Sequence, residues 1–378
     1  MRILHGPANV GNQPWSISRA ERALGHASDV VQNYGTWLGY PADRTISAHG
    51  VRSPKARFDR SIFALTAPFR YDVIHYYFGR SFMLWDDFGR VLGRSPNEDR
   101  VALRDVHLAR RLGRRLIMTL QGCDARIAGR SNAMNAHTPC SEGRCRYYGN
   151  CIKQLDSSRL AMIETLLPLM DRVFYLNPEL GHFIPNGQFL PYGNVDVMAS
   201  PVLPPRTSGR PRIVHAPSDG STKGTPTILA ALDVLKERFD FELILVEGKP
   251  HGEAMEIYKS ADIAIDQILY GWYGGFAVEM MAMGKPVMCH IRDSDMKFVP
   301  KRMLADLPIV NIHPDRLADD IALALQARES WQDWSRRSVE FVRRWHDPTV
   351  IASFLLEAYV AEGESADLGK HIIRRTEG

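Results

Sequence analysis

Short apolar runs alternate along this chain with longer segments in which apolar residues recur every three or four positions. In the first half, the apolar runs that predict buried strands are residues 2–5, 29–31, 72–77, 115–120 and 172–176. Residues 14–24 have helical periodicity and precede Gly25, a residue suited to the left-handed position after a helix. Beyond residue 212, strand and helix patterns alternate to about residue 330, as a parallel doubly wound sheet requires.

A break in this alternation predicts the domain organisation. Residues 200–212 (SPVLPPRTSGRPR) are rich in Pro, Ser and Gly, which is typical of a linker. The sequence therefore predicts an N-terminal α/β domain over residues 1–199 and a C-terminal α/β domain over residues 213–347. An amphipathic segment at residues 348–360 predicts a final helix.

The segment 261–288 carries the strongest functional pattern. An apolar run ends at Asp266, a turn with three glycines follows, and a helix then carries Glu279 in its second turn. Gly284 suits the end of that helix. A glycine turn between a strand and a helix start exposes backbone N–H groups and the positive end of the helix dipole to an anion. An ordinary strand–helix–strand crossover is the alternative.

A second loop of this kind begins after the apolar residues 213–215. Residues 218–224 read as a polar glycine loop, with Thr225 as the N-cap and Pro226 as the first residue of the next helix. Lys223 stands just before that helix, where it can pair with phosphate. Because ligands bind beyond the carboxyl ends of the strands in such sheets, the two loops together predict a pocket for a diphosphate-bearing nucleotide.

These residues carry a resemblance to a known family. The KGT turn at residues 223–225 and the block DQ…GWYG…VEMMAMGKPV resemble the donor half of retaining, GT-B-fold glycosyltransferases (group 1, family 4-like), in a divergent subfamily. The resemblance implies that Lys223 contacts the donor phosphates and that Glu279 holds the nucleotide ribose. It also implies two Rossmann-like domains facing a cleft, with a helix in residues 348–366 crossing back to complete the N-terminal domain.

The sequence departs from the family pattern at two places. Residues 215–218 lack the arginine that relatives have before the lysine, and Gly271 stands where relatives tend to have a glutamate. Asp266 and Gln267 are candidates for the missing polar contacts. The donor-binding residues that we predict are Gly6, Gly11, Ser221, Thr222, Lys223, Gly224, Asp266, Gln267, Gly274, Gly275 and Glu279.

The loop GPANVGNQPW after the first strand is a further candidate. It is not the G-x-G-x-x-G of dinucleotide binders, but its place matches the GT-B loop that faces donor and acceptor. Gly6 and Gly11 would permit close backbone approach, although a plain turn is the alternative. Gln121 stands where relatives often have a histidine. Since an amide cannot act as a base, we expect Gln121 to position acceptor or sugar hydroxyls and group it with Lys223 and Glu279 as the catalytic set.

Composition narrows the class of protein. The 378 residues are 45% apolar and 24% charged, as in an ordinary soluble protein, and a net charge of +4 gives no support for nucleic-acid binding. The N-terminus lacks the apolar core of a secretory signal, and no run approaches the ~20 apolar residues of a membrane span. We therefore expect a cytoplasmic protein.

Cysteine usage points to a structural metal site as one interpretation. Four of the five cysteines, Cys123, Cys140, Cys145 and Cys151, lie within 29 residues. The spacing His137-x2-Cys140-x4-Cys145-x5-Cys151 offers four ligands to a structural zinc ion. Free buried thiols and a disulfide are the alternatives.

Arginines also cluster between residues 100 and 115, in a predicted helix that leads into a strand. Such a helix could make peripheral contact with an anionic membrane surface, where lipid-linked acceptors are found. Interspersed acidic residues favour a merely solvated face.

The predicted function is transfer of a hexosyl unit from a nucleotide-diphosphate sugar to a hydroxyl of a glycan, lipid-linked or small-molecule acceptor. The resemblance implies retention of configuration, and Lys223 with two helix N-termini would replace a metal cofactor. One alternative is a sugar-nucleotide 2-epimerase that uses His5, His75 and His215. The other is a non-catalytic protein that binds a nucleotide sugar.

Overall fold

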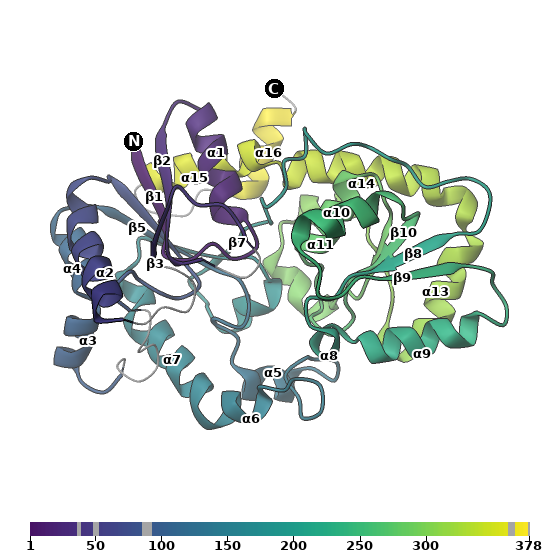
Figure 1. Ribbon diagram of the computed structural model, residues 1–378, viewed down its shortest axis with the longest axis horizontal. Helices are drawn as coiled ribbons and strands as arrows, with labels where there is room; N and C mark the ends of the chain where they lie inside the picture. The colour runs from purple at the N-terminus through teal and green to yellow at the C-terminus, as the bar shows by residue number, and fades with distance from the viewer. Residues whose placement is uncertain (36–38, 48–52, 85–92, 362–366, 377–378) are drawn as a thin grey trace. The chain divides into compact units, whose positions relative to one another are not determined.

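Two compact α/β units make up the protein. The computed structural model describes residues 1–35, 39–47, 53–84, 93–361 and 367–376. The first unit comprises Met1–Gly129, Asn150–Asn194 and Pro348–His371. The second comprises Arg130–Gly149, Val195–Asp347 and Ile372–Gly378. Each contains one parallel sheet with helices packed on it, which confirms the predicted fold class (Figure 1).

The first unit contains a seven-stranded sheet in the order β3-β2-β1-β4-β5-β6-β7, and every neighbouring pair is parallel. Its strands are β1 (Arg2–Gly6), β2 (Ala27–Tyr34), β3 (Arg44–Ser47), β4 (Val73–Tyr77), β5 (Arg115–Leu120), β6 (Arg172–Tyr175) and β7 (Gln188–Phe189). The five predicted strands are confirmed. The sequence missed β3 and β7, because these short strands at the outer positions carry too few apolar residues to show a period.

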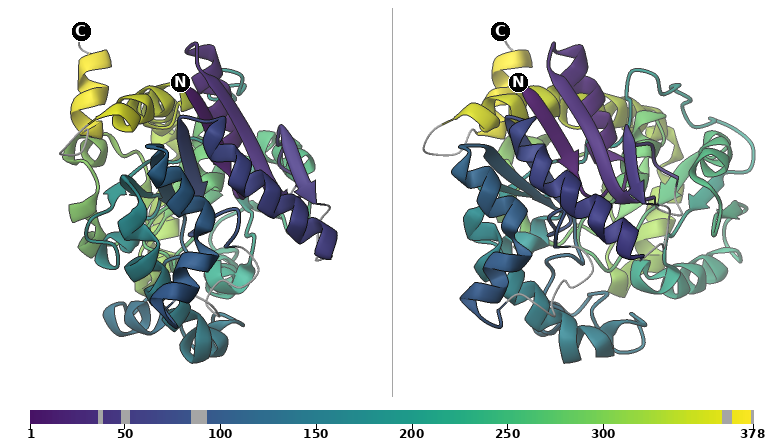
Figure 2. Two further views of the ribbon diagram at one scale, coloured as in Figure 1. Left: turned by 90° about the vertical axis from the view of Figure 1, so that its left-hand side faces the viewer. Right: turned by 60° about the vertical axis from the view of Figure 1, so that its left-hand side comes forward.

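Helices pack on this sheet. The helices of the first unit are α1 (Gln13–Ala23), α2 (Pro54–Thr66), α3 (Pro96–Ala102), α4 (Arg104–Arg111), α7 (Asp156–Thr165) and α15 (Pro348–Val360). Short helical turns join them: η1 (Ala67–Phe69), the π-helical η2 (Cys151–Leu155), η3 (Leu167–Leu169) and η4 (Pro178–His182). Figure 2 shows α2 running alongside the first strands, and α2 contacts β3.

The predicted C-terminal helix is confirmed as α15. It packs beside α1 in the first unit (Figure 1), with Ile351, Phe354 and Leu355 fully buried. Gly193 lies at this contact, since a Cβ there would stand 2.9 Å from Ile17 and 3.0 Å from Ile351. Residues 362–366 of the predicted crossing segment lie outside the described residues.

The second unit contains a five-stranded parallel sheet in the order β12-β11-β10-β8-β9. Its strands are β8 (Arg212–His215), β9 (Glu242–Leu245), β10 (Ile263–Ile265), β11 (Val287–Cys289) and β12 (Val310–Asn311). Its helices are α8 (Gly220–Lys223), α9 (Thr225–Leu235), α10 (His251–Lys259), α11 (Gly275–Ala282), α12 (Lys301–Asp306), α13 (Leu317–Gln326) and α14 (Trp331–Trp345). Its 3-10 turns are η5 (Asp293–Phe298), η6 (Pro314–Arg316) and η7 (Arg328–Ser330). Apolar side chains of the strands, α9 and α13 form one buried core.

Three further helices span or adjoin the boundaries between units: α5 (Ala128–Met134), α6 (Tyr148–Asn150) and α16 (Leu368–Thr376). The chain passes from the first unit to the second at three places, after Gly129, after Asn194 and after His371. Arg206 pairs with the buried Asp262 over 2.6 Å and fastens its segment to the second unit. The role of residues 200–212 as a linker stays a prediction.

Each sheet reverses its strand order beside its first strand. The reversal lies between β1 and β4 in the first sheet and between β8 and β10 in the second. Loops that leave the carboxyl ends of such a pair run in opposite directions, which opens a crevice where α/β proteins bind ligands. The predicted loops after β8 and β10 therefore flank the reversal point of the second sheet.

Candidate functional site

The loop after β8 is more ordered than the sequence predicted. The sequence predicted a polar glycine loop over residues 218–224, but part of it forms the one-turn helix α8. Asp219 caps this helix, because its side chain accepts a 3.2 Å hydrogen bond from Thr222 N. Gly224, with φ of 86°, ends α8 and caps α9, so Thr225 begins α9 instead of capping it. Glycine is required here because its φ is positive and a Cβ would collide with Ile268.

Two loops meet at a buried ion pair. Lys223 Nζ donates to Asp266 Oδ1 over 2.9 Å, and Gly274 N donates to Asp266 Oδ2 over 2.6 Å. The Asp266 side chain is fully buried, whereas 12% of the Lys223 side chain is exposed. Ile268 N also donates to Lys223 O over 3.1 Å. The structure thus brings together predicted residues from both loops around one carboxylate.

Gly274 lies in van der Waals range of the ion pair. A Cβ on Gly274 would lie 3.5 Å from Asp266 Oδ2, 3.7 Å from Lys223 Nζ and 3.8 Å from Gln267 Nε2. Gly274 caps α11, and Gly275 is its first residue. The first-turn amides of a helix have no acceptor within the helix, so this backbone presents N–H groups beside the ammonium group.

The ion pair with Asp266 limits the charge and the hydrogen bonds that Lys223 can offer to a ligand. An ammonium group has three N–H donors, and Asp266 accepts one of them. Asp266 also neutralises the charge of Lys223 locally. A phosphate bound here would receive the remaining donors of Lys223 and the amides at the start of α11, while Asp266 would repel it.

Glu279 has a partner that the sequence did not reveal. Its side chain is 11% exposed, and His251 Nε2 lies 2.8 Å from its Oε1. The hydrogen bond to Glu279 raises the pKa of His251, against the opposing effect of burial. His251 is the first residue of α10, 28 residues before Glu279, and no motif spacing connects the two.

The remaining predicted residues of the second unit support the loops. Ser221 is exposed on α8, and the Thr222 side chain donates to Asp219 O over 3.2 Å. Gln267 Nε2 donates to Trp272 O over 2.6 Å and so braces the turn that precedes Gly274.

The structure explains why position 271 is a glycine and not the glutamate of the family pattern. Its φ is 71°, and a Cβ would stand 2.7 Å from Arg292 Cβ. A glutamate at this position would be strained and would collide with Arg292. Arg292 donates to Leu269 O over 3.0 Å and thus occupies the space beside the turn.

In the first unit, the loop after β1 meets the end of β5. Gln121 Nε2 donates to Val10 O over 3.0 Å, and Asn177 Nδ2 donates to Gln121 O over 2.6 Å. Gly6 is required because a Cβ would collide with Phe82, and Gly11 has a positive φ of 69°. Gln121 therefore fastens the loop that contains Gly11.

The histidines of the epimerase alternative are fully buried. His5 Nε2 lies 2.8 Å from Glu21 Oε2, and His75 Nε2 lies 2.7 Å from Thr119 Oγ1. His215 Nδ1 lies 2.8 Å from the backbone oxygen of Ile265. Burial lowers the pKa of His75 and of His215. These rings serve internal hydrogen bonds.

The predicted His–Cys zinc site has no support from the structure. None of the five cysteines is in a disulfide, and across the described residues no cysteine belongs to a cluster of potential metal ligands. Cys151 belongs to the first unit, whereas His137, Cys140 and Cys145 belong to the second. Arg126 contacts the Cys123 sulfur over 3.6 Å. The disulfide alternative is equally absent.

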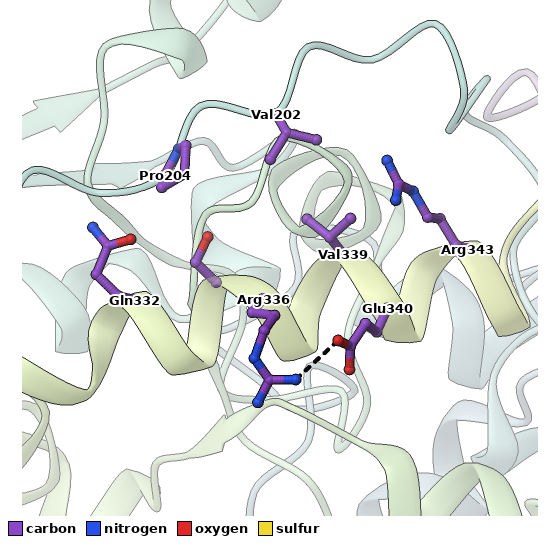
Figure 3. Close-up of a pocket in the computed structure, with 8 residues that line it drawn as sticks. Val202, Pro204, Gln332, Arg336, Val339, Glu340 and Arg343 are labelled. Carbon is purple, nitrogen blue, oxygen red and sulfur yellow. Dashed lines mark hydrogen bonds and ion pairs between the residues drawn. The ribbon is translucent and has the colours of Figure 1, made fainter.

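A pocket of about 340 Å³ lies elsewhere in the second unit, between α14 and residues 202–204 (Figure 3). An ion pair of 2.9 Å between Arg336 and Glu340 borders it. None of the predicted site residues lines this pocket, so we do not assign it to the donor.

The described part of the chain contains no helix that is both long and apolar enough to cross a membrane.

Comparisons with known proteins identify the fold. No family model matches the sequence, and no curated protein matches it. Sucrose-phosphate synthase from Thermosynechococcus elongatus is similar in structure at a TM-score of 0.59 and 14% identity, covering 95% of this chain and 98% of that one. HepE of Anabaena, solved with UDP and glucose, has a TM-score of 0.56 and 11% identity over 96% and 100%. A glycosyltransferase from Rickettsia africae has a TM-score of 0.55 and 13% identity over 94% and 97%.

These matches extend over both units. The chain therefore has the GT-B fold, as the resemblance in its sequence implied.

Proposed function

We propose that this protein is a glycosyltransferase that uses a nucleotide-diphosphate sugar. The observation that carries the proposal is the cluster of Lys223, Asp266 and Gly274 at the reversal point of the second sheet. The GT-B fold supports it, because HepE, which shares that fold, was solved with UDP-glucose. In this proposal residues 213–347 bind the donor, and residues 1–199 with 348–366 serve the acceptor.

The proposed chemistry depends on neutralising the leaving diphosphate. Lys223 and the amides at the start of α11 would stabilise the charge that develops on it, in place of a metal ion. The same-face attack implied by the family resemblance gives the acceptor proton to the leaving phosphate and retains configuration. That route requires no base from the enzyme, which is consistent with the neutral amide of Gln121.

Two other residues have positioning roles in this proposal. Glu279 would accept hydrogen bonds from the ribose hydroxyls while His251 fixes its carboxylate. Gln121 would position acceptor or sugar hydroxyls, because it holds the loop after β1. The transferred unit is a hexosyl group, and the acceptor is a hydroxyl of a glycan, a lipid-linked molecule or a small molecule.

A non-catalytic nucleotide-sugar-binding protein is the second candidate, since Asp266 offsets the charge of Lys223. The epimerase has less support because His5, His75 and His215 are buried in internal hydrogen bonds. Incubation with common nucleotide sugars separates these functions. Slow release of nucleotide indicates a transferase, an isomerised sugar an epimerase, and binding alone a non-catalytic protein.

Calorimetry with UDP and UDP-glucose tests the site itself. Lys223→Ala should remove a charge-assisted contact worth roughly 1.5–3 kcal/mol and should lower turnover more than affinity. Glu279→Ala should weaken binding of UDP and UDP-glucose alike, and Glu279→Gln should be milder because an amide oxygen still accepts a hydrogen bond. Glu256→Ala, exposed on α10, is the matched control. Unchanged UDP affinity in Glu279→Ala would overturn the assignment.

A further inference from the structure

Three histidine rings gather in the second unit, away from the ion pair of the donor site. His137 lies after α5, His290 follows β11, and His313 follows β12. The ring centroid of His313 is 5.3 Å from that of His137 and 5.2 Å from that of His290. The rings of His137 and His290 are 6.3 Å apart. Three imidazoles from separate segments thus lie close together.

A carboxylate lies at the same place. Asp315 Oδ2 is 3.1 Å from His137 Nε2 and 3.7 Å from His313 Nδ1. Potential ligand atoms of these three residues all lie within 4.8 Å of one another. In a tetrahedral zinc site with bonds of about 2.0–2.1 Å, ligand atoms are ~3.3 Å apart. The observed separations bracket that value.

His290 adds a second, independent observation. It is only 6% exposed, and within the described chain its Nδ1 atom has no hydrogen-bond partner.

A simple ion pair between His137 and Asp315 does not explain this arrangement. Such a pair needs no second imidazole, yet His313 Nδ1 lies 3.7 Å from the same carboxylate oxygen. The nearby cation, Arg292, is already engaged, since its Nη1 pairs with Asp295 over 2.9 Å. Its Nη2 donates to His137 O over 2.7 Å and holds the backbone of His137 in place.

We propose that His137, His313 and Asp315 bind a divalent transition-metal ion of the zinc type, with the ring of His290 beside them. Imidazole with one carboxylate suits zinc and related ions, whereas calcium and magnesium prefer oxygen ligands. The 41% exposed His313 and 68% exposed Asp315 side chains give the ion access. The ion would fasten residues 130–149 to the body of the second unit, without any cysteine ligand.

The site also adjoins the turn of the candidate donor site. Arg292 N donates to Gly271 O over 2.9 Å, and His290 N donates to Gln267 O over 3.1 Å. Metal binding would therefore stabilise the segment against which residues 267–271 pack. The proposal does not depend on the proposed transferase activity.

Zinc titration of the full chain, purified without a histidine tag, tests the proposal. The parent should bind about one equivalent of zinc, and zinc should raise its Tm. His137→Ala and His313→Ala should each weaken zinc binding at least ~10-fold, the lower end of what even outer contacts of a metal site contribute. His107→Ala, on α4, and Cys145→Ser are matched controls that should bind zinc like the parent.

Cobalt substitution gives a readout that does not depend on the variants. Cobalt in the parent should give the visible bands of nitrogen and oxygen ligation, without a sulfur-to-cobalt charge-transfer band. Any of three results would overturn the proposal: no specific zinc binding by the parent, equal affinity in His313→Ala, or loss of zinc in Cys145→Ser. A sulfur charge-transfer band would overturn it as well.

Discussion

The hydroxyl of Tyr359 donates a hydrogen bond to Glu21 Oε1 over 3.1 Å, joining two residues that are 338 positions apart. The same hydroxyl lies 2.8 Å from His75 Nδ1. Glu21 Oε2 in turn lies 2.8 Å from His5 Nε2 and accepts from Ser28 Oγ over 2.6 Å. All five side chains are buried. The C-terminal helix α15 is thus held to α1 and the sheet by a buried polar network as well as by apolar packing.

We predict that Tyr359→Phe destabilises the first unit. The change keeps the ring but leaves buried Glu21 Oε1 without its donor and His75 Nδ1 without its hydroxyl partner, at a cost of about 1–3 kcal/mol. Urea unfolding followed by fluorescence measures the loss. Tyr147→Phe, whose parent residue is 53% exposed, is the control and should change little. Equal stability of the two variants would contradict a structural role for the network.

Asp266→Asn should have opposite effects on UDP affinity and on thermal stability. It removes the charge that repels a diphosphate and offsets Lys223, so UDP affinity should rise several-fold. It also weakens the contacts to Lys223 and Gly274, so Tm should fall. Calorimetry and thermal unfolding measure the two quantities. A loss of UDP affinity in a folded Asp266→Asn protein would show that Asp266 contacts the ligand favourably.

Gly224→Ala should disturb the junction of the two donor loops. The substitution strains a backbone with φ of 86° and drives a Cβ into Ile268. Gly248→Ala is the matched control, since its φ is 63° but nothing lies within 4 Å of the added Cβ. Both variants carry a backbone cost of about 1–3 kcal/mol, and only Gly224→Ala should lose UDP affinity as well. Equal UDP affinity in the two variants would argue against the junction as part of the site.

His251→Ala should change the pH dependence of stability. The partner Glu279 raises the pKa of His251, so the folded state binds its proton more tightly than the unfolded state. The stabilisation is therefore fully present below the unfolded pKa of about 6.5 and is lost as pH rises through the raised pKa. Because the 38% exposed ring is screened by water, the effect should be only ~0.2–1 kcal/mol.

Urea titrations between pH 5 and 9 measure this difference between parent and variant. His107→Ala provides a control of opposite sign, because burial and then neighbouring arginines lower the pKa of His107. Its stabilising contribution is lost as pH falls. A difference between parent and His251→Ala that does not vary with pH would contradict the ion pair with Glu279.

Local patterns in the sequence predicted most of the strands and helices discussed here. The continuous apolar runs of β1, β4 and β5 predicted strands because a parallel sheet is buried on both faces. The apolar spacing of residues 348–360 predicted α15, and Gly284 marked the end of α11 with a φ of 72°. These features depend on neighbours along the chain, which is the information that a sequence displays directly. The short strands β3 and β7 were not predicted, because they form only through pairing with β2 and β6.

The partners of the site residues were decided by the tertiary structure alone. The sequence placed Lys223 and Asp266 in two loops, but only strand order brought them to one ion pair across 43 positions. It grouped His137 with cysteines because they are close in sequence. Folding instead set His137 beside Asp315, 178 residues away, and next to His313. Ligand spacing in a sequence constrains nearby residues only, whereas a side chain meets whatever the packed sheets and helices bring within reach.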